Sequence, residues 1–183
     1  MTTKSAGAYL RNLVKTYRTY KEMAERAIEQ VGSEEDLNRE LDENSNSIAV
    51  IAKHVSGNLR SRFRDFLTSD GEKPDRNRDT EFEEPPAKRE TVLALWEQGW
   101  LHLFSALEPL CDADLQRTVT IRGEAHSVMQ AINRQMAHYS YHCGQIVLLA
   151  KHFKHAEWKS LSVPRKQSAD FNRRVGAGEA SQR

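Results

Sequence analysis

Two histidines lie four residues apart in the segment QMAHYSYHCGQ, residues 135–145. No proline or glycine separates His138 from His142, so one helix can run through both. At about 100° per residue the two side chains lie some 40° apart on one face, with one helical turn between them. Imidazole is a common ligand of zinc, copper, iron and nickel, so the pair could hold one ion. An ordinary polar pair on a solvated helix face is the alternative, and the spacing alone does not decide between them.

A third histidine, His54, lies in the middle of the segment IAVIAKHVSGNLRSRF, residues 48–63. Its angular offset from the apolar stripe of that segment resembles the offset of His138 and His142 from theirs. Two helices packed side by side could therefore bring three imidazoles together. Three neutral imidazoles that leave one coordination position open are typical of a catalytic zinc site. Asn58, one turn after His54, could orient a ligand or a bound water, or it is a simple exposed amide.

Other kinds of site find no support in the sequence. There is no His-Glu-x-x-His, no Glu-x-x-His and no Gly-x-Ser-x-Gly, which speaks against a metallopeptidase, a ferritin-like di-iron centre and a serine hydrolase. Cys143 points about 100° away from His142, and we interpret it as a small buried hydrophobic residue. No carboxylate stands at a clear spacing from the histidines to act as a general base. Asp65 shares the face of His54 but lies about three turns away.

The elements that must position these histidines are helical nearly throughout. Apolar residues recur at steps of three and four, which predicts amphipathic helices over about residues 5–31, 48–68, 87–108 and 125–153. Asn46 or Ser47 can cap the second of them. Four helices of this kind pack most economically as an all-α four-helix bundle. We expect a single domain over residues 1–172, followed by a disordered tail at 173–183.

Two segments interrupt the helical pattern. Residues 68–86 are rich in proline and alternating charge, and a connection of this length is often functional or mobile. We expect it to cover one end of the bundle or to meet a second subunit, with a plain solvated crossover as the alternative. The segment RTVTIRGEAHS, residues 117–127, has β-branched alternation and a glycine, and it predicts at most a small β-ribbon.

Charge and composition exclude several classes of partner. The chain has 183 residues with 27 Lys and Arg against 26 Asp and Glu, so nothing favours nucleic acid or an acidic membrane surface. No apolar run approaches the roughly 18 to 20 residues of a membrane span, and the start of the chain lacks the pattern of a signal peptide. Two cysteines form neither a disulfide framework nor a cysteine-based zinc site. We therefore expect a cytoplasmic protein.

The arrangement of the histidines resembles that of a known family. One histidine in the middle of the second helix and a His-x-x-x-His pair on the last helix of a bundle resemble the DinB/YfiT-like superfamily. Residues 54–82, 120–153 and 158–172 resemble a branch of that superfamily whose function is unassigned, and the resemblance covers roughly residues 8–172. The metal-ligand positions of the family match His54, His138 and His142, without departure at any of the three.

The resemblance implies a bundle with up-down-down-up connectivity, a long crossover between the second and third helices, and a homodimer. It also implies a divalent metal ion, zinc or nickel in the first place and iron or manganese as further candidates. Better-understood relatives use low-molecular-weight thiols to transfer or isomerise their substrates, and others are described as metal-dependent hydrolases. No thiol-binding motif is readable in this chain, so the small-molecule substrate is open.

Two classes of function follow from these expectations. In the first, the protein is a metal-dependent hydrolase or a thiol S-transferase, whose ion lowers the pKa of a bound water or thiol and polarises the substrate. In the second, it is a non-catalytic metal- or ligand-binding protein associated with stress, in which the ion only ties the second and fourth helices together. A general base near the three histidines would favour the first class, and the sequence does not reveal one.

Overall fold

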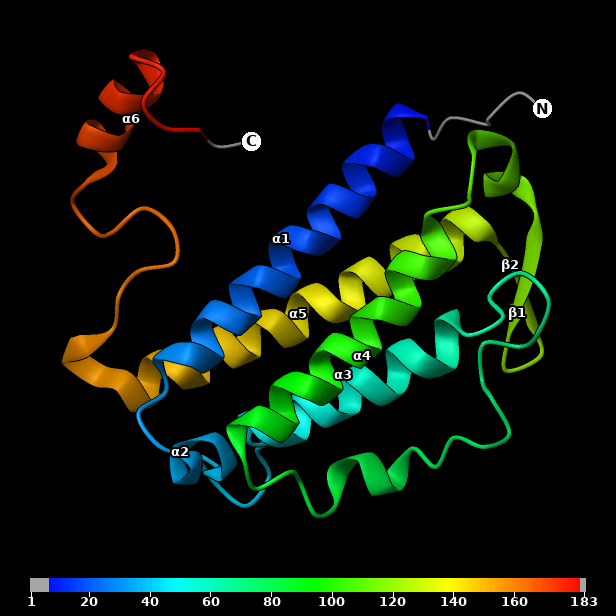
Figure 1. Ribbon diagram of the computed structural model, residues 1–183, viewed down its shortest axis with the longest axis horizontal. Helices are drawn as coiled ribbons and strands as arrows, with labels where there is room; N and C mark the ends of the chain where they lie inside the picture. Colours follow the sequence, from blue (N-terminus) through cyan, green and yellow to red (C-terminus); the bar gives the residue numbers. More distant parts are fainter. Residues whose placement is uncertain (1–6, 182–183) are drawn as a thin grey trace.

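Four long helices form the body of the protein in the computed structural model, which describes residues 7–181. They are α1 (Ala8–Gln30), α3 (Ile48–Phe63), α4 (Arg89–Leu107) and α5 (Val128–Lys154). In Figure 1, α3 and α4 run in the same direction, and α1 and α5 run in the opposite one. The connectivity is therefore up-down-down-up. The predicted all-α bundle with a long crossover between its second and third long helices is confirmed.

The apolar stripes read from the sequence face one common core. Trp100 of α4 lies at its centre and makes edge-to-face contacts with Tyr17 of α1 and Tyr139 of α5, at 5.9 and 5.7 Å between ring centroids. The hydroxyl of Tyr17 donates to the carbonyl oxygen of Ile132, and that of Tyr139 donates to Oδ1 of Asn58. The two buried phenols therefore find hydrogen-bond acceptors on other helices.

The parallel pair α3 and α4 packs closely because small residues meet at their contact. A Cβ atom at Gly99 would lie 2.8 Å from Cα of Ser56, which is closer than packed atoms allow. Glycine at this position lets the two backbones approach. The close approach holds α3, and with it His54, against the rest of the bundle.

The helix boundaries differ from the predicted ones where local hydrogen bonds compete with the helix. Ser47 caps α3 as expected, since its side chain accepts from the N–H of Val50. This helix ends at Phe63, earlier than the predicted residue 68, and the chain turns at Asp65, where φ is 51°. The last long helix begins at Val128 rather than near residue 125, because the residues before it pair in a β-strand.

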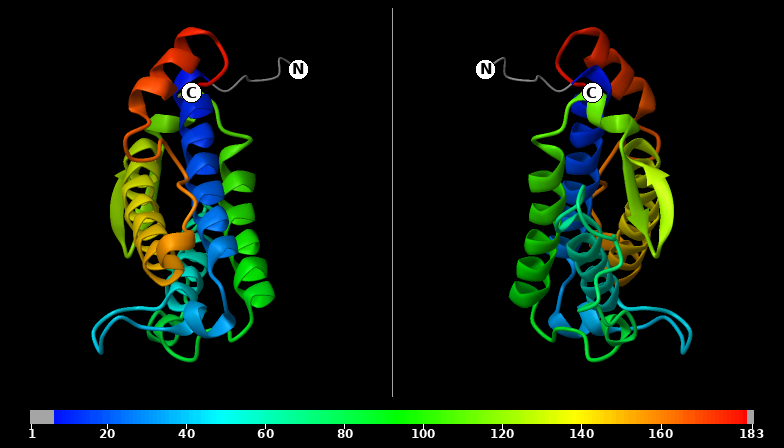
Figure 2. Two further views of the ribbon diagram at one scale, coloured as in Figure 1. Left: turned by 90° about the vertical axis from the view of Figure 1, so that its left-hand side faces the viewer. Right: turned by 90° about the vertical axis from the view of Figure 1, so that its right-hand side faces the viewer.

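That strand belongs to a small antiparallel hairpin, β1 (Thr118–Ile121) and β2 (Glu124–Ser127), which confirms the predicted ribbon. Arg122 and Gly123 form its two-residue turn, with φ of 56° and 77°, as a type I′ turn requires. The hairpin lies at the end of the bundle where α4 finishes and α5 starts (Figures 1 and 2). The backbone N–H groups of both turn residues donate to the carboxylate of Asp70, which ties the hairpin to the crossover.

The crossover between α3 and α4 runs back beside α3 (Figure 1), and its 3-10 helix η1 (Asp79–Phe82) packs directly on that helix. Nζ of Lys53 donates to the carbonyl oxygens of Thr80 and Glu83, both at 2.6 Å. This position differs from the expected cover over one end of the bundle, and the alternative that the segment meets a second subunit stays a prediction. A crossover must return the whole length of α3 before a parallel neighbour can start, so it lies along the side of that helix.

Smaller elements complete the described part of the chain. They are α2 (Glu34–Asn38), which is capped by Ser33, and the 3-10 helices η2 (Asp112–Gln116) and η3 (His155–Glu157). Helix α6 (Ser168–Gly176) stands apart from the bundle in Figure 1 and buries none of its residues. The sequence predicts neither α2 nor α6, because a short helix with few buried residues has little apolar periodicity.

The predicted limits of the domain and of its tail stay predictions, and residues 1–6 and 182–183 of those ranges lie outside the described residues. Within the described range, no helix is both long enough and apolar enough to cross a membrane.

Candidate metal centre

The structure brings His54, His138 and His142 together where α3 passes α5. Nε2 of His138 lies 3.5 Å from Nε2 of His54 and 3.2 Å from Nε2 of His142. One nitrogen from each ring lies within 4.8 Å of the other two, so the group could hold a single metal ion. The expected convergence of the two helix flanks is therefore present. That an ion binds there stays a prediction.

The outer nitrogens of two rings have hydrogen-bond acceptors that assign their tautomers. Nδ1 of His54 lies 2.8 Å from Oε2 of Glu81, and Nδ1 of His142 lies 2.8 Å from Oε1 of Gln145. A carboxylate or amide oxygen accepts a hydrogen bond from Nδ1–H, and in a neutral ring the lone pair then lies on Nε2. Lone pairs of both rings then point towards His138. Nε2 of His138 can donate a proton of its own to one of these nitrogens, or, when it carries no proton, it can share a metal ion with both of them. The arrangement therefore fits a metal ion.

Burial keeps two of the three histidines, His138 and His142, in the form that binds metal. His54 and His142 are buried, and His138 is half-buried. Burial in the first place, and the neighbouring His142 and His54 after it, together lower the pKa of His138 to about 3. Burial also lowers the pKa of His142 to about 4, with His54 adding to the effect and the bond to Gln145 opposing it. Both rings are therefore neutral at neutral pH, as a ligand must be.

Glu81, from η1 in the crossover, is a carboxylate that the sequence did not connect with the site. Nε and Nη2 of Arg76 lie 2.8 and 2.9 Å from its two oxygens, so the guanidinium binds both of them and shares Oε2 with His54. Burial raises the pKa of Glu81, but the hydrogen bonds from His54 and Arg76 outweigh burial, and the net pKa is lowered. Since both oxygens are engaged and the group is ionised, Glu81 orients His54 rather than moving a proton.

Gly57 explains how Glu81 comes so close to α3. A Cβ atom at Gly57 would lie 2.4 Å from Oε1 of Glu81, so any larger residue would push the carboxylate away. Gly57 follows His54 by three residues and lies on the same side of the helix. No local spacing pattern marks Glu81, which is 27 residues from His54. The length and charge of the crossover were the only features of the sequence that indicated a role for the segment that contains Glu81.

Aromatic rings flank the histidines on two sides. The ring of Phe82 lies 4.7 Å from that of His54, and the ring of Tyr141 lies 4.0 Å from that of His142, between centroids. Phe82 is half-buried and Tyr141 is exposed. The two rings give the site an apolar rim, against which the carbon skeleton of a small molecule could rest.

The other residues that the sequence brought forward have different roles. Asn58 is buried and accepts a hydrogen bond of 2.9 Å from Tyr139, so it joins α3 to α5 instead of facing solvent. Asp65 is exposed, beyond the last residue of α3. Cys143 is fully buried, and burial raises the pKa of its thiol to about 12, which confirms it as a small core residue.

Comparison with known proteins supports the fold and leaves the chemistry open. A family described as "Protein of unknown function (DUF1572)" matches residues 4–167. Among solved structures, a DinB-like protein from Bacillus cereus ATCC 10987 is similar, with a TM-score of 0.59 and 14% sequence identity. The similarity covers 78% of this chain and 91% of that one, and at this identity it shows the fold alone. No curated protein matches the chain.

Proposed function

The chain belongs to the DUF1572 family and has the DinB-like fold, and from this premise we propose that it binds one divalent metal ion through His54, His138 and His142. The resemblance to the DinB/YfiT-like superfamily is confirmed at the level of family and fold. The observation that carries the proposal is the convergence of three Nε2 atoms, two of which belong to rings whose opposite nitrogens are hydrogen-bonded to Glu81 and Gln145.

The donor set supports some metals more than others. Three imidazoles suit zinc, nickel or iron, whereas magnesium and calcium prefer carboxylate and carbonyl oxygens. We place zinc or nickel first, and iron or manganese after them. Three protein ligands leave at least one position of a four-coordinate ion for a substrate, which is the pattern of a catalytic site rather than of a closed structural one.

The reaction we propose is hydrolysis or thiol-dependent transfer on a small molecule. A bound divalent ion supplies Lewis acidity to a carbonyl oxygen or a leaving group. The chain itself supplies the fixed orientation of the rings, through Glu81 and Gln145, and the apolar rim of Phe82 and Tyr141. Because Glu81 is not free to take a proton, a nucleophile that is already acidic suits this site, and a low-molecular-weight thiol is the example we favour.

A non-catalytic role is the second candidate, and the position of the ligands favours it. His54 comes from α3 and the other two histidines come from α5, so an ion would join two helices that each pack more extensively against another helix than against one another. In this case the metal stabilises the bundle by binding the folded state only. The family resemblance also predicts a homodimer, and we keep this as a proposal. Sedimentation of the purified protein tests it.

Metal analysis of untagged protein tests the binding step. We expect about one equivalent of a transition metal in the wild type and none in His142→Ala. His152→Ala is the matched control, because His152 is an exposed histidine near the end of the same helix. Equal metal content in wild type and His142→Ala would contradict the proposed site.

A screen of ester, amide and thiol-acceptor substrates then separates the two candidates. Turnover by the metal-loaded wild type that disappears in His142→Ala supports the enzyme. Full metal occupancy without turnover on any of these substrates favours the non-catalytic protein. Turnover that persists undiminished in His142→Ala contradicts a metal-dependent reaction.

A further inference from the structure

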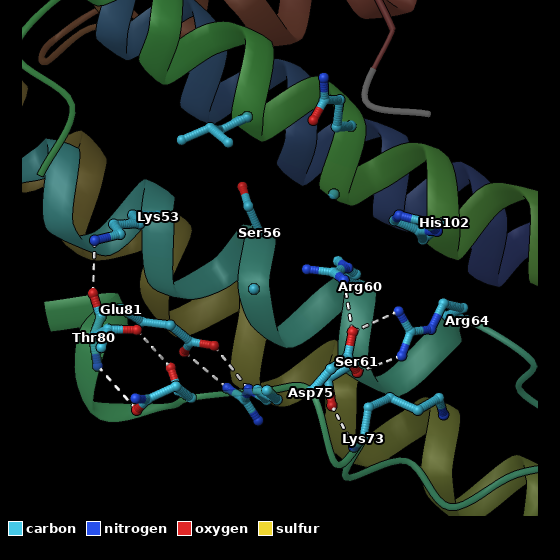
Figure 3. Close-up of a pocket in the computed structure, with 16 residues that line it drawn as sticks. Lys53, Ser56, Arg60, Ser61, Arg64, Lys73, Asp75, Thr80, Glu81 and His102 are labelled. Atoms are coloured by element: carbon cyan, nitrogen blue, oxygen red, sulfur yellow. Dashed lines mark hydrogen bonds and ion pairs between the residues drawn. The ribbon is translucent and has the colours of Figure 1, made fainter.

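One cavity in the described part of the chain is separate from the three histidines. It has a volume of about 370 Å³ and lies between α3, α4 and the crossover (Figure 3). None of the three histidines lines it. Cavities of about 300 to 1,000 Å³ commonly hold small ligands. The wall it shares with the metal centre is the pair Glu81 and Arg76, whose other side faces His54.

The charges that line this cavity do not cancel. Five cationic side chains and two carboxylates contribute to its wall. Arg76 and Glu81 neutralise each other, which leaves Asp75 as the lining carboxylate that faces Arg60 and Arg64. Lys53 and Lys73 donate to backbone carbonyl oxygens and form no ion pair with a described carboxylate. An excess of positive charge around a partly enclosed space attracts anions.

Asp75 shows what kind of anion the two arginines hold. Nη1 and Nη2 of Arg64 donate to the two oxygens of Asp75 in the paired geometry that suits a carboxylate. Nη2 of Arg60 donates to one of the same oxygens at 2.7 Å. Figure 3 shows the carboxylate of Asp75 between the two guanidinium groups. Asp75 and Arg60 are both about half exposed, so the carboxylate of an entering molecule can replace that of Asp75 without opening the core.

Helix α4 supplies the rest of a binding surface. Leu95 and Gly99 form an apolar part of the wall, and Leu95 is only half-buried. The side-chain amide of Gln98 forms no hydrogen bond with a described residue. His102 also lines the cavity, and burial, followed by the charges of Arg60 and Arg64, lowers its pKa. A neutral ring and a free amide can each donate one hydrogen bond to a ligand.

We propose that this cavity is a binding site for a small organic carboxylate, whose charged group replaces Asp75 on Arg60 and Arg64 and whose carbon skeleton lies over Leu95 and Gly99. The site is independent of the metal ion. Asp75 pairs with both arginines when no ligand is bound, and it competes with the carboxylate of the ligand for them. Carboxylates and phosphates share this recognition chemistry, and the paired geometry of Arg64 favours the carboxylate.

Titration of chelator-treated, metal-free protein with 3-phenylpropionate tests the proposal, with amide chemical shifts of Gln98 and Gly99 as the readout. The titration is run at an ionic strength of about 0.05 M, because salt screens an exposed charged site. We expect saturable binding, no binding of the neutral 3-phenylpropanamide, and weaker binding of phenyl phosphate. Tighter binding of phenyl phosphate would overturn the assignment of the ligand as a carboxylate.

Variants locate the binding in the cavity. Arg64→Gln should weaken binding of 3-phenylpropionate at least about tenfold, which is the loss of one charge-assisted contact of about 1.5 kcal/mol. Asp75→Asn should strengthen it, because the competing carboxylate is gone. Arg173→Gln is the control, since Arg173 also pairs with an aspartate but lies on α6. No saturable binding, or equal binding by wild type and Arg64→Gln, overturns the proposal.

A last variant separates this proposal from the metal centre. His142→Ala removes a proposed metal ligand but leaves every residue of the cavity in place. It should bind 3-phenylpropionate as tightly as the wild type does. Loss of binding in this variant would show that the carboxylate occupies the metal centre instead, and would overturn the second site while leaving the proposed metal site standing.

Discussion

The ring of His54 is held by a residue that reaches it from a different element. Glu81 accepts a hydrogen bond from Nδ1–H of the ring, and Arg76 donates to both oxygens of that carboxylate. Such outer partners fix the orientation and the tautomer of a metal-binding histidine. At the scale of single residues, the competence of the proposed site therefore depends on Glu81 as well as on the three histidines.

Replacement of Glu81 should reveal this dependence in a graded way. We expect Glu81→Ala to lower metal affinity by about 10- to 100-fold, and Glu81→Gln to lower it less, because an amide oxygen can still accept from His54. Metal titration with a competing chelator measures the affinity, and thermal unfolding shows separately how much the loss of a partner for Arg76 destabilises the fold. Glu83→Ala is the control, since Glu83 is exposed. Equal affinities of Glu81→Ala and wild type would contradict the orienting role.

The metal-free protein should lose stability as the pH falls below the ordinary range of histidine. His138 and His142 titrate in the folded state with a pKa of about 3 and about 4, against 6.5 as the ordinary value. Between these values the unfolded chain binds more protons than the folded one, so the free energy of unfolding decreases with falling pH. Urea unfolding at several pH values from about 7 to about 4 measures the effect.

The control for this pH dependence is the variant His138→Gln/His142→Gln, which has no imidazole at either position. Its stability should depend less on pH over the same interval, because glutamine does not titrate. The carboxylates of Asp70 and Asp75, with a pKa of about 2 each, change stability only at lower pH, below the ordinary value of 3.8. Equal pH dependence of variant and wild type would contradict the depressed pKa values.

At the scale of elements, the position of the crossover beside α3 decides the surroundings of both proposed sites. It carries Glu81 and Phe82 to the histidines, and it carries Asp75 to the arginines of the cavity. Lys53 fastens η1 to α3 through two backbone carbonyls, and Asp70 fastens the start of the crossover to the hairpin turn. A segment attached at both ends by hydrogen bonds should open less often than a free loop of the same length.

Removal of the first attachment should make the crossover more accessible. We expect Lys53→Met, which keeps most of the aliphatic stem, to accelerate trypsin cleavage after the exposed Arg78 several-fold, while the helical content stays unchanged. Mass spectrometry of timed digests measures the rate. Lys15→Met on α1 is the control, because Lys15 is exposed and remote from the crossover in sequence. Cleavage of wild type and Lys53→Met at the same rate would show that the hydrogen bonds of Lys53 do not restrict the opening of the crossover.

At the scale of the whole molecule, the aromatic cluster around Trp100 joins three of the four long helices. Its partners Tyr17 and Tyr139 come from α1 and α5, and all three rings are fully buried. The packing of these helices against one another therefore does not require a metal ion. A protein stabilised in this way can lose its metal ion and keep its fold, as the tests of the proposed function require.

Trp100→Ala should destabilise the protein by about 3 to 5 kcal/mol, the usual cost of removing a large buried side chain. The neighbouring Leu101 is 61% exposed, so Leu101→Ala should change the free energy of unfolding by less than about 0.5 kcal/mol. Urea unfolding followed by circular dichroism compares the two variants with the wild type. A small effect of Trp100→Ala would place the centre of the core elsewhere.

The sequence by itself determined the features that depend on local spacing. The apolar periodicity predicted the four long helices, the cap at Ser47, and the common face of His138 and His142. The matching offset of His54 pointed to its partners, although 84 residues separate it from His138. These features follow from about 3.6 residues per turn, which relates sequence position to helix face without knowledge of the fold.

Only the tertiary structure decided which side chains of other elements contact the histidines and line the cavity. Glu81 reaches His54 because the crossover returns beside α3 and because Gly57 leaves room for its carboxylate. Asp75 contacts Arg60 and Arg64 because the crossover that carries it returns beside α3. The cavity exists because the crossover and α4 lie against the same side of α3. The path of an irregular segment is set by many weak contacts with distant residues, and no periodicity along the chain records them.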